Sequence, residues 1–293
     1  MAGVLAAMAG LSVVADRALA NNAPEVRVES PANNAAEMRM EAPARAEVAA
    51  ASSETAAVVP AVPFGPGEHL VYRVSVGVLG GSGRALLGVA GIDTIRGRPA
   101  YHLGFWVKGR ALVASVENNL QSWMDIETLA SLRFDQMQDE IRTKRHRIFD
   151  FYPEERRWKR VDSNSSGELP TDHPLDDVSF LFYARTLPLE VGQTYTLPYY
   201  FKASGNPVTL KVLRRERVRV PAGTFETIVV QPIIRAGGLF GEGGRAEVYF
   251  SDDDRRLIVQ MRSRLPVLGH LNLELEKISL GTLLADRGRP SGS

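Results

Sequence analysis

The chain has 293 residues and a formal net charge of +1, with 44% hydrophobic and 24% charged residues. This balance is typical of a globular protein and lacks the large positive charge of a nucleic-acid-binding domain. The sequence contains no cysteine, which excludes disulfides, thiolate nucleophiles, zinc–thiolate sites and iron–sulfur clusters. Histidines and carboxylates are therefore the strong metal ligands that remain.

The N-terminal segment resembles an export signal. Residues 2–15 form an uncharged apolar run, and Ala18-Leu19-Ala20 follows as an A-x-A cleavage box. The run is too short to span a bilayer, which takes about 20 residues. We expect residues 1–20 to be a signal peptide and the mature protein to be periplasmic, without a transmembrane span. A disordered alanine-rich leader is the alternative, because no lysine or arginine precedes the run.

Residues 21–63 contain a duplicated tract. Residues 21–32 and 33–44 are identical at 8 of 12 positions, and the rest is mostly Ala, Pro, Glu and Ser. A tract without aromatic residues cannot bury enough apolar surface to offset its chain entropy. The segment is expected to be a disordered linker, with a partner-binding peptide as the alternative.

From Phe64 onward, polar and apolar residues alternate in short segments separated by turn residues, which predicts β-strands. The spacing is too short for crossover helices, so the strands should pair antiparallel. The predicted strands are 69–79, 84–95, 100–109, 129–138, 145–152, 156–162, 193–201, 207–220, 224–234, 245–251, 255–265 and 270–280.

About a dozen strands exceed what an open twisted sheet usually carries, so the sheet should curl or split. Residues 175–187 have near-helical apolar spacing, and Asp172 is a candidate N-cap. The expected fold is mainly β: a large curled antiparallel sheet (a spiral or unclosed β-barrel) over residues 64–281, with one amphipathic helix as plug or lid. Residues 282–293 are expected to be a disordered tail.

Three stretches together resemble a family of bacterial exported proteins, domain of unknown function 3108. They are Phe64–Glu68 with the strand pair that follows, Leu175–Ser179 with the segment after it, and the hairpins at 220–232 and 248–275. The resemblance covers residues 64–281. It implies a periplasmic β-rich protein whose fold is similar to spiral or unclosed-barrel envelope proteins, including carriers of outer-membrane lipoproteins. It implies no established activity and no catalytic residues.

The sequence shows no convergent catalytic motif, and we expect no catalytic residue, metal site or cofactor. Gly80–Gly83 lacks the spacing of a nucleophile elbow, and no glycine-rich phosphate loop precedes a helix. Histidines and carboxylates cluster once, near the predicted helix start. Helix capping explains this cluster, and a general acid–base pair is the alternative. Its members are Asp172, His173, Asp176 and Asp177.

Two groups of residues are candidates for binding. Large aromatic side chains could line an apolar cavity on the concave face of the sheet, and we name Trp106, Trp123, Phe134, Phe182, Tyr200 and Tyr249. A run of basic residues is best explained as a solvated hairpin face, and contact with anionic headgroups or an acidic partner is the functional alternative. This run comprises Arg142, Lys144, Arg145, Arg147, Arg157 and Lys159.

Together these features favour binding over catalysis. The first hypothesis is a non-enzymatic cell-envelope protein that binds a lipid, an acyl chain or another amphipathic ligand in the concave sheet. The second is a scaffold with a solid core that binds another envelope protein, and the third is a hydrolase of cell-wall or lipid material. A cavity would distinguish the first from the second, and a histidine–carboxylate hydrogen bond in a cleft would favour the third.

Overall fold

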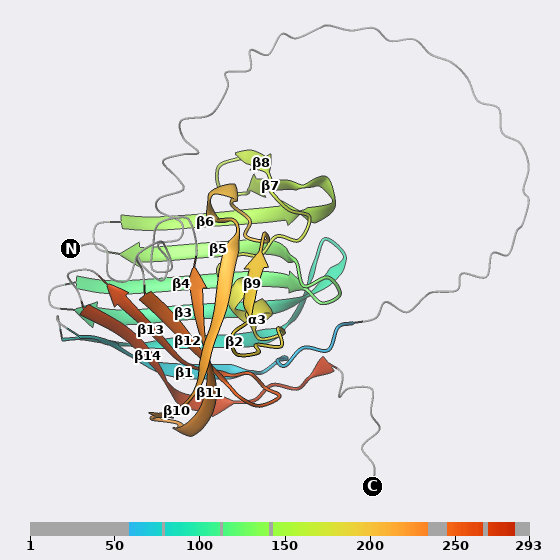
Figure 1. Ribbon diagram of the computed structural model, residues 1–293. Coiled ribbons are helices and arrows are strands. Elements are labelled where there is room, and N and C mark those ends of the chain that lie inside the picture. Colours follow the sequence, from blue (N-terminus) through green and yellow to red (C-terminus); the bar gives the residue numbers. More distant parts are fainter. Residues whose placement is uncertain are drawn as a thin grey trace, which may run out of the picture.

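A computed structural model describes residues 59–77, 80–111, 114–140, 143–233, 245–265 and 269–284. In these residues fourteen strands form one antiparallel sheet (Figure 1), in the order β8-β7-β6-β5-β4-β3-β2-β1-β14-β13-β12-β11-β10-β9. The strands are β1 (His69–Val76), β2 (Gly81–Ile95), β3 (Arg98–Ala111), β4 (Ala114–Asp125), β5 (Ser131–Glu140), β6 (Thr143–Tyr152), β7 (Arg157–Arg160), β8 (Ser166–Glu168), β9 (Thr194–Leu197), β10 (Val208–Val220), β11 (Gly223–Ile233), β12 (Arg245–Ser251), β13 (Ile258–Leu265) and β14 (Gly269–Ser279).

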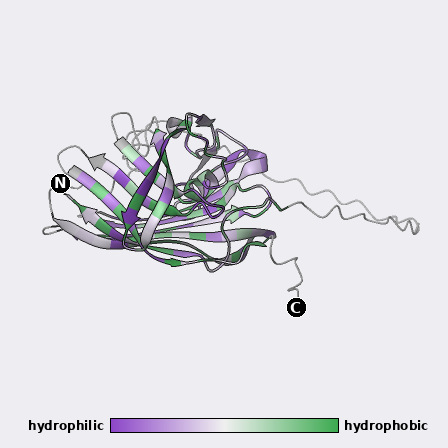
Figure 2. Cartoon of the chain, turned by 60° about the horizontal axis from the view of Figure 1, so that its bottom comes forward, coloured by the Kyte–Doolittle hydropathy of each residue, from purple (hydrophilic) through white to green (hydrophobic). Residues whose placement is uncertain are grey.

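The alternation in the sequence becomes a two-faced sheet. In β1, Leu70, Tyr72 and Val74 are buried, whereas His69 and Arg73 are exposed. Successive side chains of a strand point to opposite faces, so this pattern places one apolar row against the core. Figure 2 shows hydrophobic and hydrophilic residues alternating along the strands.

The sheet curls but does not close among the described residues, because its end strands β8 and β9 pair with β7 and β10 and not with each other. The β10–β11 hairpin crosses in front of the β1–β14 region (Figure 1). At its turn, the backbone N–H of Ala222 donates to the carbonyl oxygen of Leu275, at 2.9 Å. The fold is therefore a strongly coiled, unclosed sheet, as the sequence predicts.

The segment between β8 and β10 fills the hollow of the sheet. It contains a short helix, α3 (Ser179–Ala184), the strand β9 and a 3-10 turn, η2 (Ala203–Gly205); a second such turn, η1 (Pro153–Glu155), joins β6 to β7. A parallel bridge between Leu175 and Tyr200 folds the segment back on itself. We call the face of the sheet that this segment covers the concave face.

A buried ion pair fixes α3 to the first strand. Arg185, directly after the helix, donates to both carboxylate oxygens of Glu68, at 2.5 and 3.0 Å, and both side chains are fully buried. Arg185 also donates to the carbonyl oxygens of Pro63 and Arg255. Its guanidinium lies 5.3 Å from the ring centres of Phe64 and Phe182. The Phe64–Glu68 stretch therefore serves as the anchor for the helix.

Several predicted elements need correction. The helix covers Ser179–Ala184 and not 175–187, and Asp176, not the exposed Asp172, accepts the backbone N–H groups at its start. The strand predicted over 193–201 ends at Leu197, before Pro198, because proline has no N–H for the ladder. The sequence reading also missed β8 and, more importantly, β4. In β4 the polar run Glu117-Asn118-Asn119 hides the alternation, since Asn118 is buried in place of an apolar residue.

The core extends to the borders of the described residues. Val62 and Phe64 are buried before β1, and Leu284 packs against the core after β14. The predicted signal peptide, most of the predicted linker and residues 285–293 of the predicted tail lie outside the described residues.

Candidate functional site

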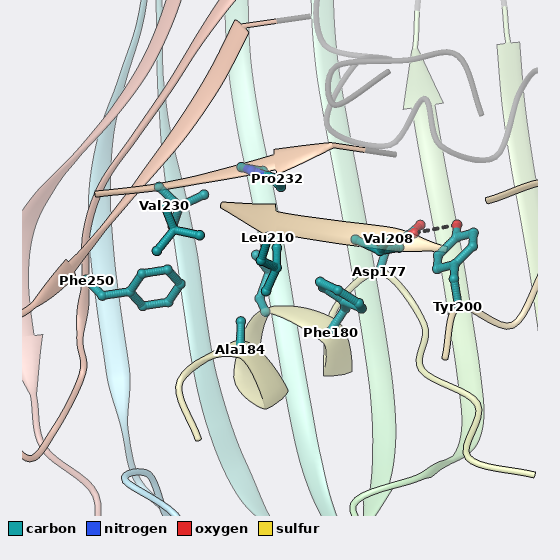
Figure 3. A pocket seen from close by; sticks show the side chains of 11 residues that line it. Asp177, Phe180, Ala184, Tyr200, Val208, Leu210, Val230, Pro232 and Phe250 are labelled. Carbon is teal, nitrogen blue, oxygen red and sulfur yellow. Dashed lines mark hydrogen bonds between the residues drawn. The ribbon is translucent and has the colours of Figure 1, made fainter. Parts of the chain in front are cut away.

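An apolar cavity lies between α3 and the strands β10–β12 (Figure 3). Its volume is about 50 Å³, counted as the space that the centre of a water-sized sphere can reach. Since one water needs roughly 10–15 Å³ by this measure, the cavity has room for a short chain segment and not for a large ligand. Its lining residues are Asp177, Phe180, Leu181, Ala184, Tyr200, Val208, Leu210, Val230, Pro232, Val248 and Phe250.

The strand periodicity explains why this lining is apolar. Val208 and Leu210 are two residues apart in β10, as are Val230 and Pro232 in β11, and Val248 and Phe250 in β12. Residues at this spacing share one face of a strand. The pairing of β10 with β11 places Leu210 opposite Pro232, and the pairing of β11 with β12 places Val230 opposite Val248. These side chains therefore form one continuous surface.

Asp177 and Tyr200 provide the polar groups of the cavity. The Tyr200 hydroxyl donates to Asp177 Oδ1 at 2.7 Å, and Gln136 Nε2 lies 3.4 Å from Asp177 Oδ2. Tyr200 is positioned by Asn206, which accepts its backbone N–H at 2.9 Å and donates to its carbonyl at 2.6 Å. The ring also packs on Gly205, where a Cβ atom would lie only 2.3 Å from Cδ1 of Tyr200.

Burial raises the pKa of Asp177 from 3.8 to about 6, and the nearby positive charge of Lys202 and the Tyr200 hydrogen bond partly oppose this shift. Burial also holds the pKa of the Tyr200 hydroxyl well above its usual range, so Tyr200 remains a donor. Among the described residues that line the cavity, Asp177 is therefore the carboxyl group whose charge changes near pH 6.

Asp176 has a different, structural role. Its carboxylate accepts hydrogen bonds from the Ser122 hydroxyl at 2.6 Å and from the backbone N–H groups of Val178 and Ser179 at 2.9 and 3.0 Å. The Ser131 and Ser179 hydroxyls lie 2.7 Å apart beside it. Burial raises the pKa of Asp176, and these hydrogen bonds oppose the shift. The network fixes the start of α3 against β4 and β5.

The titration of Asp177 leads to a testable expectation. The folded protein binds a proton at Asp177 more tightly than the unfolded chain, so its stabilising contribution is complete at low pH and is lost as the pH rises toward its folded pKa of about 6. Asp177→Asn stays neutral and keeps an oxygen for Tyr200. In urea denaturation, the free energy of unfolding of D177N minus that of the wild type should increase from about pH 4 to about pH 7. A difference that stays constant over this range would contradict the assignment.

The sequence model of the family described as "Protein of unknown function (DUF3108)" matches residues 71–276. The chain belongs to the DUF3108 family. The matched range extends from β1 to β14 and includes α3 and the cavity.

Two solved structures are similar to this DUF3108 chain. A beta-barrel-like protein of the domain of unknown function DUF1849 from Brucella abortus has a TM-score of 0.49 and 11% sequence identity, over 76% of this chain and 100% of that chain. A protein with a YmcC-like fold from Bacteroides fragilis NCTC 9343 has a TM-score of 0.28 and 12% identity, over 75% of this chain and 98% of that chain. No curated protein matches the chain significantly.

The six aromatic candidates divide between the two faces of the DUF3108 sheet. Tyr200 lines the cavity, while Phe134 and Phe182 are fully buried in the concave core, in edge-on ring contacts with Phe201 and Phe64, respectively. The other three lie on the opposite face. There Trp106 contacts Glu117, Trp123 donates to Asp93 and stacks on His102, and Tyr249 donates to Glu247.

The cavity residues that sequence reasoning missed come mainly from β10–β12 and from the helix, such as Phe180, Leu210 and Phe250. The alternation of each strand shows which of them share a face. It does not show which strands end up opposite the helix, and this depends on how the sheet curls.

The basic candidates also do not form one surface. Lys144 pairs with Asp139 and Arg157 pairs with Glu155, both at exposed positions, and Lys159 is exposed. Arg147 is buried, and it alternates with Lys144 along β6, so it lies on the concave face. Arg145 shares that face, and Arg142 lies outside the described residues.

The histidine–carboxylate cluster is not assembled as an acid–base pair. His173 packs against the rings of Tyr183 and Tyr199, burial lowers its pKa, and its Nε2 has no hydrogen-bond partner among the described residues. Asp172 is exposed, and the carboxylates of Asp176 and Asp177 bind the partners given above.

The described part of the chain lacks two kinds of feature, a cluster of metal ligands and a helix that could span a membrane. None of its histidine and carboxylate side chains form a group of three or more that could hold a metal ion. None of its helices has the length and apolar composition needed to cross a bilayer.

Proposed function

We propose that this protein is an exported cell-envelope protein that binds the apolar chain of an amphipathic ligand, such as a lipid or an acyl chain, in the cavity beneath α3. The observation that carries the proposal is the continuous apolar lining from β10, β11, β12 and α3, in which Asp177 and Tyr200 are the polar side chains among the described residues. Ligand sites typically combine such an apolar lining with a few placed polar groups. The apolar leader with its Ala18-Leu19-Ala20 box supports export to the periplasm.

The size of the cavity supports a chain and not a bulky ring system. By the measure used above, its volume of about 50 Å³ has room for a few water molecules. The same small volume favours one competing function, a scaffold whose core is essentially filled and whose surface binds another envelope protein. Measured binding of an apolar probe distinguishes the two functions.

The decisive variant fills the cavity. Ala184 is 4% exposed and lines the cavity from the end of α3, so Ala184→Leu adds a branched side chain to this space without lowering helix propensity much. We expect the affinity for a fluorescent fatty acid to fall at least tenfold. The midpoint of thermal unfolding should stay the same or rise, because the new side chain replaces empty space.

The matched control is Ala90→Leu, the same change at an exposed position of β2. It should leave probe affinity unchanged. If the wild type does not bind the probe, and Ala184→Leu lowers the unfolding midpoint, the core is already filled and the scaffold function is supported instead. Native mass spectrometry of protein purified from the periplasm of its own host should, on our proposal, detect a co-purifying lipid.

A further inference from the structure

A polar row crosses the concave face next to the cavity. The register of β4, β5 and β6 places Asn118 opposite Gln138, and Gln138 opposite Arg145. Two residues before Gln138 on β5, Gln136 lies opposite Arg147. Gln136, Gln138 and Arg147 are 1%, 3% and 7% exposed, so this row is buried inside the hollow of the sheet.

Two amide atoms in this row lack partners. Gln136 Oε1 and Gln138 Nε2 are buried and have no hydrogen-bond partner among the described residues. Buried polar atoms have hydrogen-bond partners in the great majority of native structures. Two unpaired atoms on residues that are two positions apart in β5 therefore need an explanation. Gln136 also extends from the row to the cavity, because its Nε2 lies 3.4 Å from Asp177 Oδ2. The polar row and the apolar cavity are therefore adjacent.

Three basic side chains lie in this row or close to it. Arg145 and Arg147 lie in the row, and Lys202 lies within 6.0 Å of the Phe149 ring, which neighbours Arg147 on β6. Three acidic side chains of β4 and β5 point the other way, since Glu117 pairs with Lys108, Asp139 with Lys144, and Asp135 with His146. On the concave side, Asp176 and Asp177 lie just before α3, and Asp177 borders the cavity.

We infer that the row formed by Gln136, Gln138 and Arg147 binds the head of the amphipathic ligand, and that this head is an oxyanion, either a carboxylate or a phosphate. An oxyanion accepts from the Gln138 amide and from arginine, and a protonated oxygen of the same group donates to Gln136 Oε1. The inference rests on the proposed function, because the apolar chain must bind in the cavity for its head to lie beside Gln136.

The test compares four ligands that have the same chain length and differ in the head group. Decanoate, decyl phosphate, decanol and decylamine would each displace a neutral fluorophore, N-phenyl-1-naphthylamine, from the purified protein below their micellar concentrations. We expect one or both anions to bind at least tenfold more tightly than decanol and decylamine. Tighter binding of decanoate or of decyl phosphate identifies the head as carboxylate or phosphate. Equal binding of all four would overturn the inference but leave the proposed function standing, whereas binding of none would overturn both.

The variant Gln138→Met separates recognition from structure. It removes a buried Nε2 donor that has no partner among the described residues, so the unfolding midpoint should stay the same or rise, while the preference for the anions should fall at least tenfold and decanol binding should not change. The control is Gln260→Met, because Gln260 is 1% exposed and its Oε1 also lacks a partner among the described residues. Gln260 binds Glu274 on the other face of the sheet, so its replacement should leave head preference unchanged. A Q138M protein that is destabilised yet keeps its anion preference would show that the amide is structural.

Discussion

Replacing Arg185 with methionine should lower the free energy of unfolding by about 3–5 kcal/mol, as is typical when one partner of a buried ion pair is removed. The reason is that Glu68 would remain fully buried without the two hydrogen bonds that Arg185 donates to it. The carbonyl oxygens of Pro63 and Arg255 would also lose a donor. Urea denaturation at neutral pH measures the effect.

The double variant Glu68→Leu/Arg185→Met is the informative comparison. Replacing both partners of a buried pair by apolar side chains is often neutral or stabilising, so the double variant should recover much of the lost stability. The recovery should be incomplete, because the two carbonyl oxygens stay without their donor. If the single variant lost less than about 1 kcal/mol, the pair would behave like an exposed one and the anchoring role would be wrong.

Truncating Phe182 to alanine should destabilise the protein by about 3–5 kcal/mol, the usual range for a large aromatic side chain in a packed core. Phe182 is fully buried, and its ring contacts the Phe64 ring edge-on at a centroid distance of 4.9 Å and lies beside the Arg185 guanidinium. The loss would leave a void at the junction of α3 with the segment before β1. Chemical denaturation of the variant and of the wild type measures it.

Phe180→Ala provides the contrast within the same helix. Phe180 is partly exposed and lines the cavity, so its removal enlarges an existing space and should destabilise less than Phe182→Ala. It should instead change the affinity for a fluorescent fatty acid. Equal destabilisation by the two variants would show that the side of α3 that faces the cavity is packed as tightly as the core.

These two expectations distinguish the two sides of α3. Phe182 and Arg185 join the helix to the segment before β1 and to the turn before β13, through a ring contact and a buried ion pair. Phe180 and Ala184 face the cavity. A ligand can therefore contact one side of α3 while the other side holds the helix in place.

The sequence by itself determined the sheet and the family. Alternation such as that of Leu70, Tyr72 and Val74 predicts which residues face the core, because strand geometry makes the period two wherever the strand lies in the fold. The same local rule failed in β4, where Asn118 faces the core in place of an apolar residue. The short spacing between strands also predicted antiparallel pairing, and the number of strands predicted a curled sheet.

Only the tertiary structure decided which residues meet. Glu68 and Arg185 are 117 positions apart, and no local pattern marks them as partners. Trp106 and Phe134 have the same aromatic character in the sequence, yet one lies on the outer face and the other in the concave core. The cavity likewise depends on the curl that brings β10–β12 opposite α3. Its volume is the small difference between the volume of the hollow and the volume of the side chains that fill it, and no local pattern in the sequence fixes this difference.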